Sequence, residues 1–505
     1  MNLNNYLLLC KTCDKFLEKI KYNKEISYLS WLYIIRPHPV SLRDYKKILN
    51  KEFNSNNVIL ILLKSVFRFF LILLKLIKSS FINNKDYYSS VNDDKKNFDV
   101  FILSHFINLK LKSDKNDFYF GRIPELLNNS NYSPLLIYQN PNNYNPKKLS
   151  KEWNKYNHNK IILSNQLNFF GEMKILFRAL KLISILKKIF LKDNLNNYEN
   201  MVLKQSKKEC LSYSTLSSFR LNIQLTNLIK KYNPKVIMLT YEGFGWERIV
   251  FQTAKDLNPE IVCIGYQHAC VTNYYHSLKR NLNTKLDPDI ILTSGQHGHN
   301  ILNNNKNFKI NKISVIGSFR SEKPSKVETL SNFSCIVLPE GYLSETNILL
   351  SFTLKCANLF PKINFIWRMH PVIDFKYFTK KYPGFDNLPR NITLSEDKLV
   401  NDLNKSGWAL YRGSTAIISA LNFGLTPIFV NTDDSTLIDP LIDINDCRKI
   451  ITDPNEIQDI IKIDLLNKEK NIKLFKNFSE DYYCDFKKNI FMEVFSNNIE
   501  KNILS

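Results

Sequence analysis

From residue 98 onward, short apolar runs alternate with longer stretches that carry apolar residues at helical spacing. Short apolar runs bounded by polar residues predict buried strands, and the spaced stretches predict helices. In the first half the predicted strands are Asp99–Leu103, Leu135–Tyr138, Val236–Thr240, Ile261–Gly265, Asp289–Leu292 and Ile313–Ile316, and the predicted helix is Trp246–Asp256. Strands separated by helices are typical of a parallel sheet with crossover connections.

A second series of the same kind begins at Ser334. Its predicted strands are Cys335–Leu338, Asn364–Trp367, Trp408–Tyr411 and Thr426–Val430, and its predicted helices are Thr346–Phe360, Glu456–Leu466 and Asn471–Phe495. The polar segment between Gly317 and Asn332 indicates a linker. We therefore predict an α/β protein with two facing Rossmann-type, doubly wound domains, residues 96–318 and 319–505, with a cleft between them and a helical extension over residues 1–95.

Two apolar segments carry cationic residues along one side of a predicted helix. Val58–Phe81 contains Lys64, Arg68, Lys75 and Lys78, and Met173–Lys192 contains Lys174, Arg178, Lys181, Lys188 and Lys192. Charges at these positions disfavour a membrane span and suit a helix that lies in the interface of an anionic membrane. The alternative is that both helices pack on the protein and expose their lysines to water.

Length, charge and cysteine content narrow the class of protein. A chain of 505 residues exceeds a single hydrophobic core. The net charge of +23 indicates an anionic partner, which could be nucleic acid, a membrane surface or a phosphorylated substrate. Nucleic acid is disfavoured because no zinc-finger spacing, aromatic RNA-binding motif or basic region with heptads occurs.

The nine cysteines are scattered and odd in number, which is typical of reduced thiols in a cytosolic protein. The apolar run at the start is too short for a signal peptide. We therefore expect a cytoplasmic protein on the inner face of the cytoplasmic membrane. Cys10 and Cys13 form a lone CxxC, and no second pair stands at zinc spacing, so we predict no metal there.

Polar clusters follow two predicted strands of the second half, where ligands bind in α/β domains. Arg368, His370 and Pro371 follow one strand, and Arg412-Gly413-Ser414-Thr415 follows another. Gly413 permits a tight turn, and Ser414 and Thr415 are placed to cap a helix that begins at Ala416 and stops at Gly424. Amide hydrogens, hydroxyls and Arg412 at such a helix start would bind phosphate. An ordinary helix cap and a structural histidine remain the alternatives.

Candidate residues of the first half also stand at strand ends. Glu242, in Tyr241-Glu242-Gly243, is the candidate general base, with a carboxylate at a helix start as the alternative. His105, Gln267 and His268 are candidates for acceptor or donor contacts, although a structural imidazole explains each histidine equally well. We assign no role to Asp287-Pro288-Asp289 or to the second HP sequence, Arg36-Pro37-His38-Pro39.

Taken in order, Tyr241-Glu242-Gly243, His370-Pro371 and Ser414-Thr415 resemble the motifs of GT-B glycosyltransferases of bacterial surface polysaccharides, similar to sialyl- and polysialyltransferases that use CMP-activated sugars. The sequences LSHF and YFGRIPELL are also similar to uncharacterised surface-carbohydrate biosynthesis proteins. The resemblance covers about Phe98 to Phe475. Those enzymes carry two acids where this chain has Glu242 alone, and Pro339-Glu340-Gly341 competes for the acidic role.

The resemblance implies transfer of a sugar from a nucleotide-activated donor, CMP-linked in the related enzymes, to a cell-surface polysaccharide or lipid-linked glycan such as a capsule, lipopolysaccharide or O-antigen. Glu242 and His370 would be catalytic, without a metal or cofactor. The implied donor-binding residues are Arg368, Pro371, Glu340, Gly341, Arg412, Gly413, Ser414 and Thr415. A CDP-glycerol or CDP-ribitol type polyol-phosphate transferase is one alternative, and a catalytically inactive membrane-bound scaffold is another.

Overall fold

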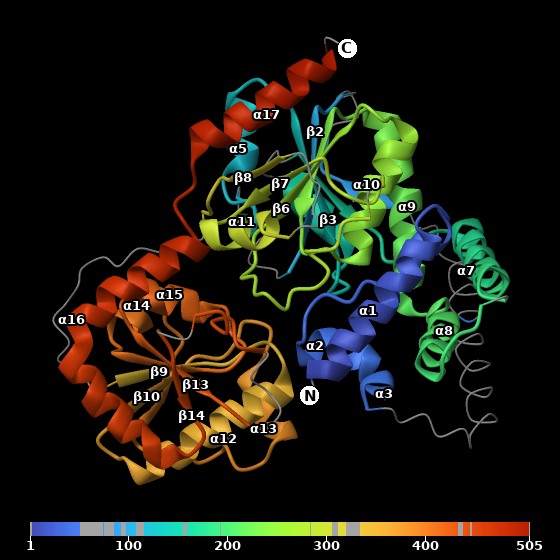
Figure 1. Cartoon of the computed structure of the whole chain (residues 1–505). Coiled ribbons are helices and arrows are strands. Elements are labelled where there is room, and N and C mark those ends of the chain that lie inside the picture. Colours follow the sequence, from blue (N-terminus) through green and yellow to red (C-terminus); the bar gives the residue numbers. More distant parts are fainter. Residues whose placement is uncertain are drawn as a thin grey trace.

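The GT-B-like architecture is confirmed: the chain forms two α/β domains, each built on a mainly parallel sheet (Figure 1). The computed structural model describes residues 3–50, 74, 85–91, 97–107, 116–154, 159–191, 193–282, 284–305, 312–319, 334–432, 438–444 and 447–503. Apart from Leu74, the predicted segment Val58–Phe81 lies outside these ranges, as does most of the linker after Gly317.

The first sheet has the strand order β1-β4-β3-β2-β5-β6-β7-β8. The strands are β1 (Tyr87–Ser89), β2 (Val100–His105), β3 (Pro134–Gln139), β4 (Lys160–Leu163), β5 (Val236–Thr240), β6 (Val262–Gln267), β7 (Ile290–Thr293) and β8 (Lys312–Val315). Only the pairing of β1 with β4 is antiparallel. Central strands such as β5 are buried along their whole length, because helices cover both faces of a parallel sheet.

Helices cover this sheet on both sides. The helices of this part of the chain are α5 (Ile123–Asn129), α6 (Pro146–Asn154), α7 (Phe169–Ile189), α8 (Asn197–Glu209), α9 (Tyr213–Tyr232), α10 (Gly245–Leu257) and α11 (Gln296–Asn303), and of these α7 and α8 pack mainly with the N-terminal segment. Asn168, Asn196 and Ser212 accept backbone hydrogen bonds as the N-caps of α7, α8 and α9. One apolar cluster contains side chains of α9 and α10, and another contains side chains of α5 and α6.

The N-terminal segment packs with α7 and α8 into a separate helical layer beside the first sheet (Figure 1). It contains α1 (Leu3–Ile20), two short 3₁₀ helices at Ile26–Tyr28 and Ser30–Leu32, then α2 (Pro39–Leu42), a 3₁₀ turn at Arg43–Tyr45 and α3 (Lys46–Leu49). Cys10 and Cys13 lie in its apolar core as free thiols. This layer brings the Arg36-Pro37-His38-Pro39 sequence next to the second domain.

The second sheet has the order β11-β10-β9-β12-β13-β14, and all of its pairings are parallel. Its strands are β9 (Ser334–Leu338), β10 (Asn364–Trp367), β11 (Ile392–Leu394), β12 (Trp408–Tyr411), β13 (Thr426–Val430) and β14 (Lys449–Ile451), with helices α12 (Leu343–Leu359), α13 (Phe375–Lys381), α14 (Leu399–Asn404) and α15 (Ala416–Asn422). α15 begins at Ala416 as predicted, and Gly424 follows it with a φ of 75°.

The predicted C-terminal helices are wrong in their boundaries. α16 runs unbroken over Ile457–Tyr482, and α17 covers Lys488–Ile503. Between them the chain returns to the first sheet, where Lys487 N donates to Ile316 O and Cys484 N donates to Ser294 O. α17 then places Phe491 and Phe495 in a core of the first domain, so the chain's end lies on that domain (Figure 1). Such long-range backbone pairing leaves no local pattern in the sequence.

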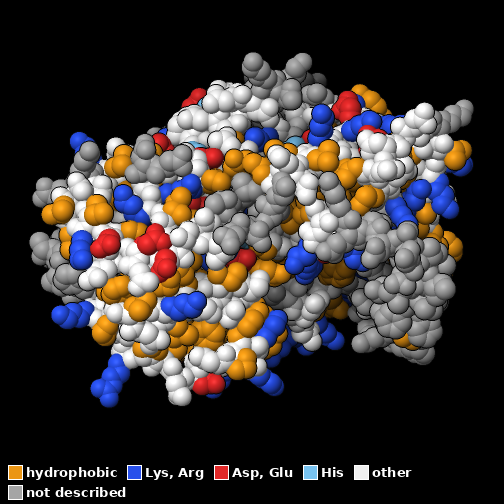
Figure 2. Space-filling view, turned by 60° about the horizontal axis from the view of Figure 1, so that its bottom comes forward, with side chains coloured by type: hydrophobic (Ala, Val, Ile, Leu, Met, Phe, Trp, Pro, Cys, Tyr) orange, Lys and Arg blue, Asp and Glu red, His pale blue; other side chains and the backbone are white. Residues whose placement is uncertain are grey.

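Among the described residues, no helix combines the length and apolar character needed to cross a bilayer. Lys and Arg side chains are spread over the face drawn in Figure 2 rather than gathered in one stripe.

Candidate functional site

The carboxyl ends of three neighbouring strands in the second sheet bring together the residues of separate sequence motifs. β9 leads into Glu340 and Gly341, β10 leads toward His370, and β12 leads into the Gly413–Thr415 turn. Because β9 lies between β10 and β12, Glu340 stands at the centre of this edge. The parallel sheet therefore brings the separate sequence clusters together at one edge.

Gly341 and Gly413 show how tightly these loops approach one another. A Cβ atom on Gly413 would lie 2.3 Å from Glu340 Oε2, and one on Gly341 would lie 3.0 Å from the His370 ring. A side chain at either position would require its neighbours to shift, so both glycines permit a close approach of the loops. Gly341 and Pro371 are exposed, which leaves this side of the site open to solvent.

His370 is held as a hydrogen-bond donor. Its Nδ1 accepts a hydrogen bond from Val372 N at 3.3 Å, which implies that the remaining proton is on Nε2. Burial lowers the pKa of His370, an effect that the nearby Glu340 carboxyl opposes. A neutral imidazole that donates from Nε2 fits a partner bearing oxygen atoms, such as phosphate.

Two arginines predicted to bind the donor are engaged elsewhere in the protein. The buried guanidinium of Arg412 donates from Nε to Glu345 Oε2 at 2.7 Å and from Nη1 to Val430 O at 2.9 Å. Arg368 donates to Asp402 Oδ2 at 2.8 Å. Arg412 is thereby joined to α12 and to the end of β13, and Arg368 to α14, so both guanidinium groups are engaged within the second domain.

The predicted helix cap at Ser414 and Thr415 is wrong in its detail. Thr415 is the N-cap of α15, but its φ of −70° and ψ of −9° are helical and its side chain makes no capping hydrogen bond. A capping hydroxyl needs an extended backbone to reach the following amide hydrogens. The Thr415 side chain instead lines a cavity between the domains.

Glu242 follows β5 at the matching edge of the first sheet. Its Oε2 accepts a hydrogen bond from the Tyr275 hydroxyl at 3.4 Å, and its Oε1 lies 3.9 Å from His268 Nε2. Burial raises the pKa of Glu242, whereas Arg36 and the Tyr275 hydrogen bond lower it. Glu242 is thus a half-buried carboxyl group whose basicity depends on its neighbours.

The turn after Glu242 is fixed by a second carboxylate that the motif did not reveal. Glu247 Oε2 accepts hydrogen bonds from the backbone N–H groups of Glu242, Gly243 and Phe244 at 2.9, 2.7 and 2.8 Å. Gly243 has a φ of 83°, and a Cβ there would lie 2.4 Å from Ser277 O. These contacts set the direction in which the Glu242 side chain leaves the turn.

The other first-domain candidates differ in their surroundings. The ring of His105 lies edge-on to Tyr119 and Trp246, and burial lowers its pKa to about 4, so it is neutral at neutral pH. Gln267 is buried, and its amide nitrogen donates to Ala269 O. Of the three candidates, His268 lies nearest to Glu242 in the contacts described.

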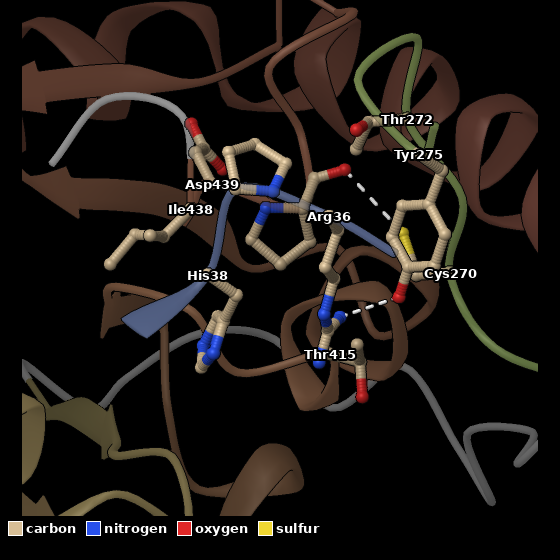
Figure 3. A pocket seen from close by; sticks show the side chains of 10 residues that line it. Arg36, His38, Cys270, Thr272, Tyr275, Thr415, Ile438 and Asp439 are labelled. Atoms are coloured by element: carbon tan, nitrogen blue, oxygen red, sulfur yellow. Dashed lines mark hydrogen bonds between the residues drawn. The ribbon is translucent and has the colours of Figure 1, made fainter. Parts of the chain in front are cut away.

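The sequence prediction missed the Arg36-Pro37-His38-Pro39 sequence, which lies between the two domains. Arg36, Pro37 and His38 line a narrow cavity of about 20 Å³, with room for about one water molecule. Cys270, Thr272 and Tyr275 line it from the first domain, and Thr415, Ile438, Asp439 and Pro440 line it from the second. Figure 3 shows the Arg36 guanidinium directed toward the Tyr275 hydroxyl.

His38 connects this segment to the second domain. Its Nε2 lies 2.5 Å from Glu340 Oε2, and both side chains are buried. The one available signal was the second HP sequence, but a contact across 302 positions leaves no trace in local periodicity. Asp287 and Asp289, which were assigned no role, have structural partners: Asp287 pairs with Arg248, and Asp289 accepts from Cys263 N.

Comparison with known proteins identifies no family for the chain. No family model matches, and no curated protein matches. The solved structures to which the chain is similar include a glycotransferase of kitacinnamycin, with 9% identity, a TM-score of 0.45, and coverage of 80% of this chain and 99% of that chain. A UDP-GlcNAc 2-epimerase from Neisseria meningitidis has 11% identity, a TM-score of 0.46, and coverage of 79% and 99%. MurG from Acinetobacter baumannii has 10% identity, a TM-score of 0.41, and coverage of 80% and 99%.

Proposed function

We propose that the chain is a glycosyltransferase that transfers a sugar from a nucleotide-activated donor, with a CMP-linked sugar as the first candidate, to a surface polysaccharide or lipid-linked glycan. One observation carries the proposal. Glu340, His370 and the Gly413–Thr415 turn meet at one sheet edge, while Glu242 stands at the corresponding edge of the other domain. Arg36 reaches Glu242 through the Tyr275 hydroxyl, and the nearby His38 contacts Glu340, which supports a single site between the domains.

The proposed reaction is a displacement at the anomeric carbon of the donor. Glu242 accepts the proton of the acceptor hydroxyl as its oxygen bonds to that carbon. The bond between the anomeric carbon and the phosphate oxygen breaks at the same time, and the nucleotide leaves with the electron pair. His370 Nε2–H and the hydroxyls of Ser414 and Thr415 stabilise the charge on the leaving phosphate. In this mechanism the compensation of charge needs no metal ion.

The nucleotide class is tested by ligand-dependent stabilisation. A ligand present at 100 times its dissociation constant stabilises the folded protein by about 2.7 kcal/mol, which a thermal melt detects. We expect CMP-sugar to raise the melting temperature and CDP-glycerol and CDP-ribitol to leave it unchanged. Stabilisation by a CDP-polyol alone would favour the polyol-phosphate transferase, and stabilisation by neither would reject a cytidine nucleotide.

The catalytic roles are tested by separate substitutions of Glu242 and His370. Glu242→Gln removes the base and keeps the size of the side chain, so we expect transfer to fall by about 10²- to 10⁴-fold with donor binding retained. His370→Ala is expected to slow transfer by removing a donor to the leaving phosphate. Unchanged product formation in both variants would reject these roles, and wild-type protein inactive with every donor would favour the scaffold.

We further propose that α7 attaches the protein to an anionic membrane. The exposed face of this helix carries large apolar side chains, with Phe170 79% and Phe177 63% exposed, and lysines at Lys174, Lys181, Lys187 and Lys188. Apolar side chains among lysines suit the interface of an anionic bilayer. Arg178 belongs to the interior, because it binds Glu25 and Asn222.

Vesicle flotation tests this attachment with a matched control. Lys181, Lys187 and Lys188 changed together to Gln should weaken binding to anionic vesicles, because each basic residue near the surface contributes about 1 kcal/mol. The control changes Lys376, Lys380 and Lys381 of α13, which removes the same charge from an exposed helix of the second domain. Equal loss in both variants would indicate a general charge effect, and loss in neither would reject α7 as the binding surface.

A further inference from the structure

The segment Ile35–Pro39, called here the 35–39 segment, contacts both domains although it belongs to neither sheet. Ile35 O accepts a hydrogen bond from Ser277 N in the first domain, and His38 contacts Glu340 in the second. Pro37 and Pro39 restrict its backbone, and Pro39 is also the first residue of α2. The segment is therefore anchored on both sides and followed directly by a helix.

Arg36 reaches the proposed base through one intermediate side chain. Its Nη1 donates to the Tyr275 hydroxyl at 2.6 Å, and that hydroxyl donates to Glu242 Oε2 at 3.4 Å. Burial alone would lower the pKa of Arg36, but the nearby Tyr275, Glu242 and Glu340 raise it, so the guanidinium is charged. Arg36 Nε is buried without a protein partner. A cation held this close to Glu242 favours the ionised carboxylate, the form that a general base requires.

His38 holds Glu340 in one orientation. Its Nδ1 accepts a hydrogen bond from Val40 N at 3.2 Å, so its proton is on Nε2 and is donated to Glu340 Oε2. Glu340 Oε1 is buried and has no hydrogen-bond partner in the protein. A buried carboxylate oxygen without a donor is costly unless a ligand supplies one. The remaining oxygen thus suits a hydroxyl or amino group of a bound ligand.

We propose that the 35–39 segment is a positioning element of the active site: Arg36 acts through Tyr275 to orient the base Glu242, and His38 orients Glu340 to accept a hydrogen bond from the sugar or base of the donor nucleotide. This inference rests on the proposed glycosyltransferase function. It makes the N-terminal segment necessary for catalysis, although the two sheets alone contain the residues of the sequence motifs. Arg36 and His38 do not touch the reacting atoms in this scheme.

The two halves of the proposal predict different kinetic defects. Arg36→Gln should move the acid limb of the pH profile of kcat/KM to higher pH and reduce activity more at low pH than at high pH. Tyr275→Phe, which keeps the ring, should shift the limb in the same direction. His38→Gln should raise the KM for the donor by about tenfold or more with a smaller change in kcat, because the Glu340 carboxylate loses the hydrogen bond from His38 that orients it. Arg43→Gln, in an exposed pair with Asp44, is the control and should change none of these values.

The charged and titratable groups that face Glu242 are Arg36, Tyr275, His268 and Glu247. His268 could produce its own limb in the profile, so Arg36→Gln is also measured in a His268→Gln background. In this background, Arg36→Gln should still move the acid limb of the kcat/KM profile to higher pH. A limb that moves only when His268 is present would overturn the assignment to Glu242.

A titration without substrate separates this inference from the proposed function. The carboxyl carbons of labelled glutamates are followed by NMR in the full chain, and the Glu242 signal is assigned by its loss in Glu242→Gln. We expect Arg36→Gln to raise the pKa of Glu242 even if no donor is ever turned over. An unmoved Glu242 titration, or a His38→Gln variant that loses kcat with an unchanged donor KM, would overturn the inference. An inactive wild type with the expected titration would reject only the transferase.

Discussion

Replacing Arg412 with methionine removes a buried cation while keeping much of the side-chain volume. Arg412 Nη2 lies 2.7 Å from Glu345 Oε2, and the two side chains are 2% and 10% exposed. The substitution would leave the Glu345 carboxylate and Val430 O without their main donor. Breaking a buried pair in this way costs about 3–5 kcal/mol, which dominates any loss of packing.

Hydrogen exchange of peptides from β9, β12 and β13 measures this cost in the second domain directly. A loss of about 3–5 kcal/mol corresponds to a fall in protection of between about 100- and several-thousand-fold. Changing both partners, as Arg412→Met with Glu345→Met, should recover a large part of the loss, because no buried charge is then unpaired. Lys405→Met, which breaks an exposed pair with Asp397, is the control and should leave exchange unchanged.

A different result would support the role in donor binding that the sequence predicted for Arg412. If Arg412→Met leaves the protection of these strands unchanged and weakens only donor binding, Arg412 contacts the donor phosphate and the ion pair with Glu345 is incidental. The ion pair and hydrogen bonds of Arg412 instead predict that Arg412→Met mainly lowers the stability of the second domain.

Three further substitutions, with Gly384→Ala as a control, test local features. Both Gly243 and Gly384 have positive φ, but only a Cβ on Gly243 would meet another atom within 4 Å. Gly243→Ala should therefore destabilise its turn by about 1–3 kcal/mol more than Gly384→Ala destabilises its own. Equal changes in the hydrogen exchange of the two turns would contradict this. Gly413→Ala should raise the donor KM about tenfold by displacing Glu340 from His38, and an unchanged KM would show that the turn relaxes freely. The pKa of His105 is about 4 in the folded protein and 6.5 when unperturbed, so between these pH values the unfolded chain binds more protons than the folded one. The free energy of unfolding should therefore fall as the pH drops from 6.5 to 4, by up to about 1.4 kcal/mol per pH unit. His105→Phe should remove that component of melting curves recorded across pH, and an unaltered pH dependence would contradict the burial of the ring.

The sequence pattern predicted the central strands well because burial on both faces makes them continuous apolar runs. β5, β12 and β13, which are buried throughout, begin and end at the predicted residues, and so does β10, although its Asn364 is exposed. The prediction missed β4 and also β1, β11 and β14, whose three residues are too few for a clear pattern. β1, β11 and β14 lie at sheet edges, where fewer residues need to be apolar.

The candidate site was predictable only where its residues directly follow strands. Glu242, Glu340, His370 and the Gly413–Thr415 turn could be located because parallel strands end at the same edge. The engagement of Arg412 by Glu345 and the position of His38 depend on tertiary contacts across 67 and 302 positions. Local propensity carries no information at such separations. The sequence pattern therefore predicts that Arg412 binds the donor, and it indicates no role for the N-terminal HP sequence.

A crystal structure with a cytidine nucleotide bound tests the central claim most directly. We predict that the phosphate will lie at the Gly413–Thr415 turn within hydrogen-bond distance of His370 Nε2, with Glu340 Oε1 accepting from the ribose or base and Glu242 facing the vacant acceptor side. A nucleotide bound away from this sheet edge, with His370 and Glu340 unchanged, would contradict the assignment of these residues to one active site.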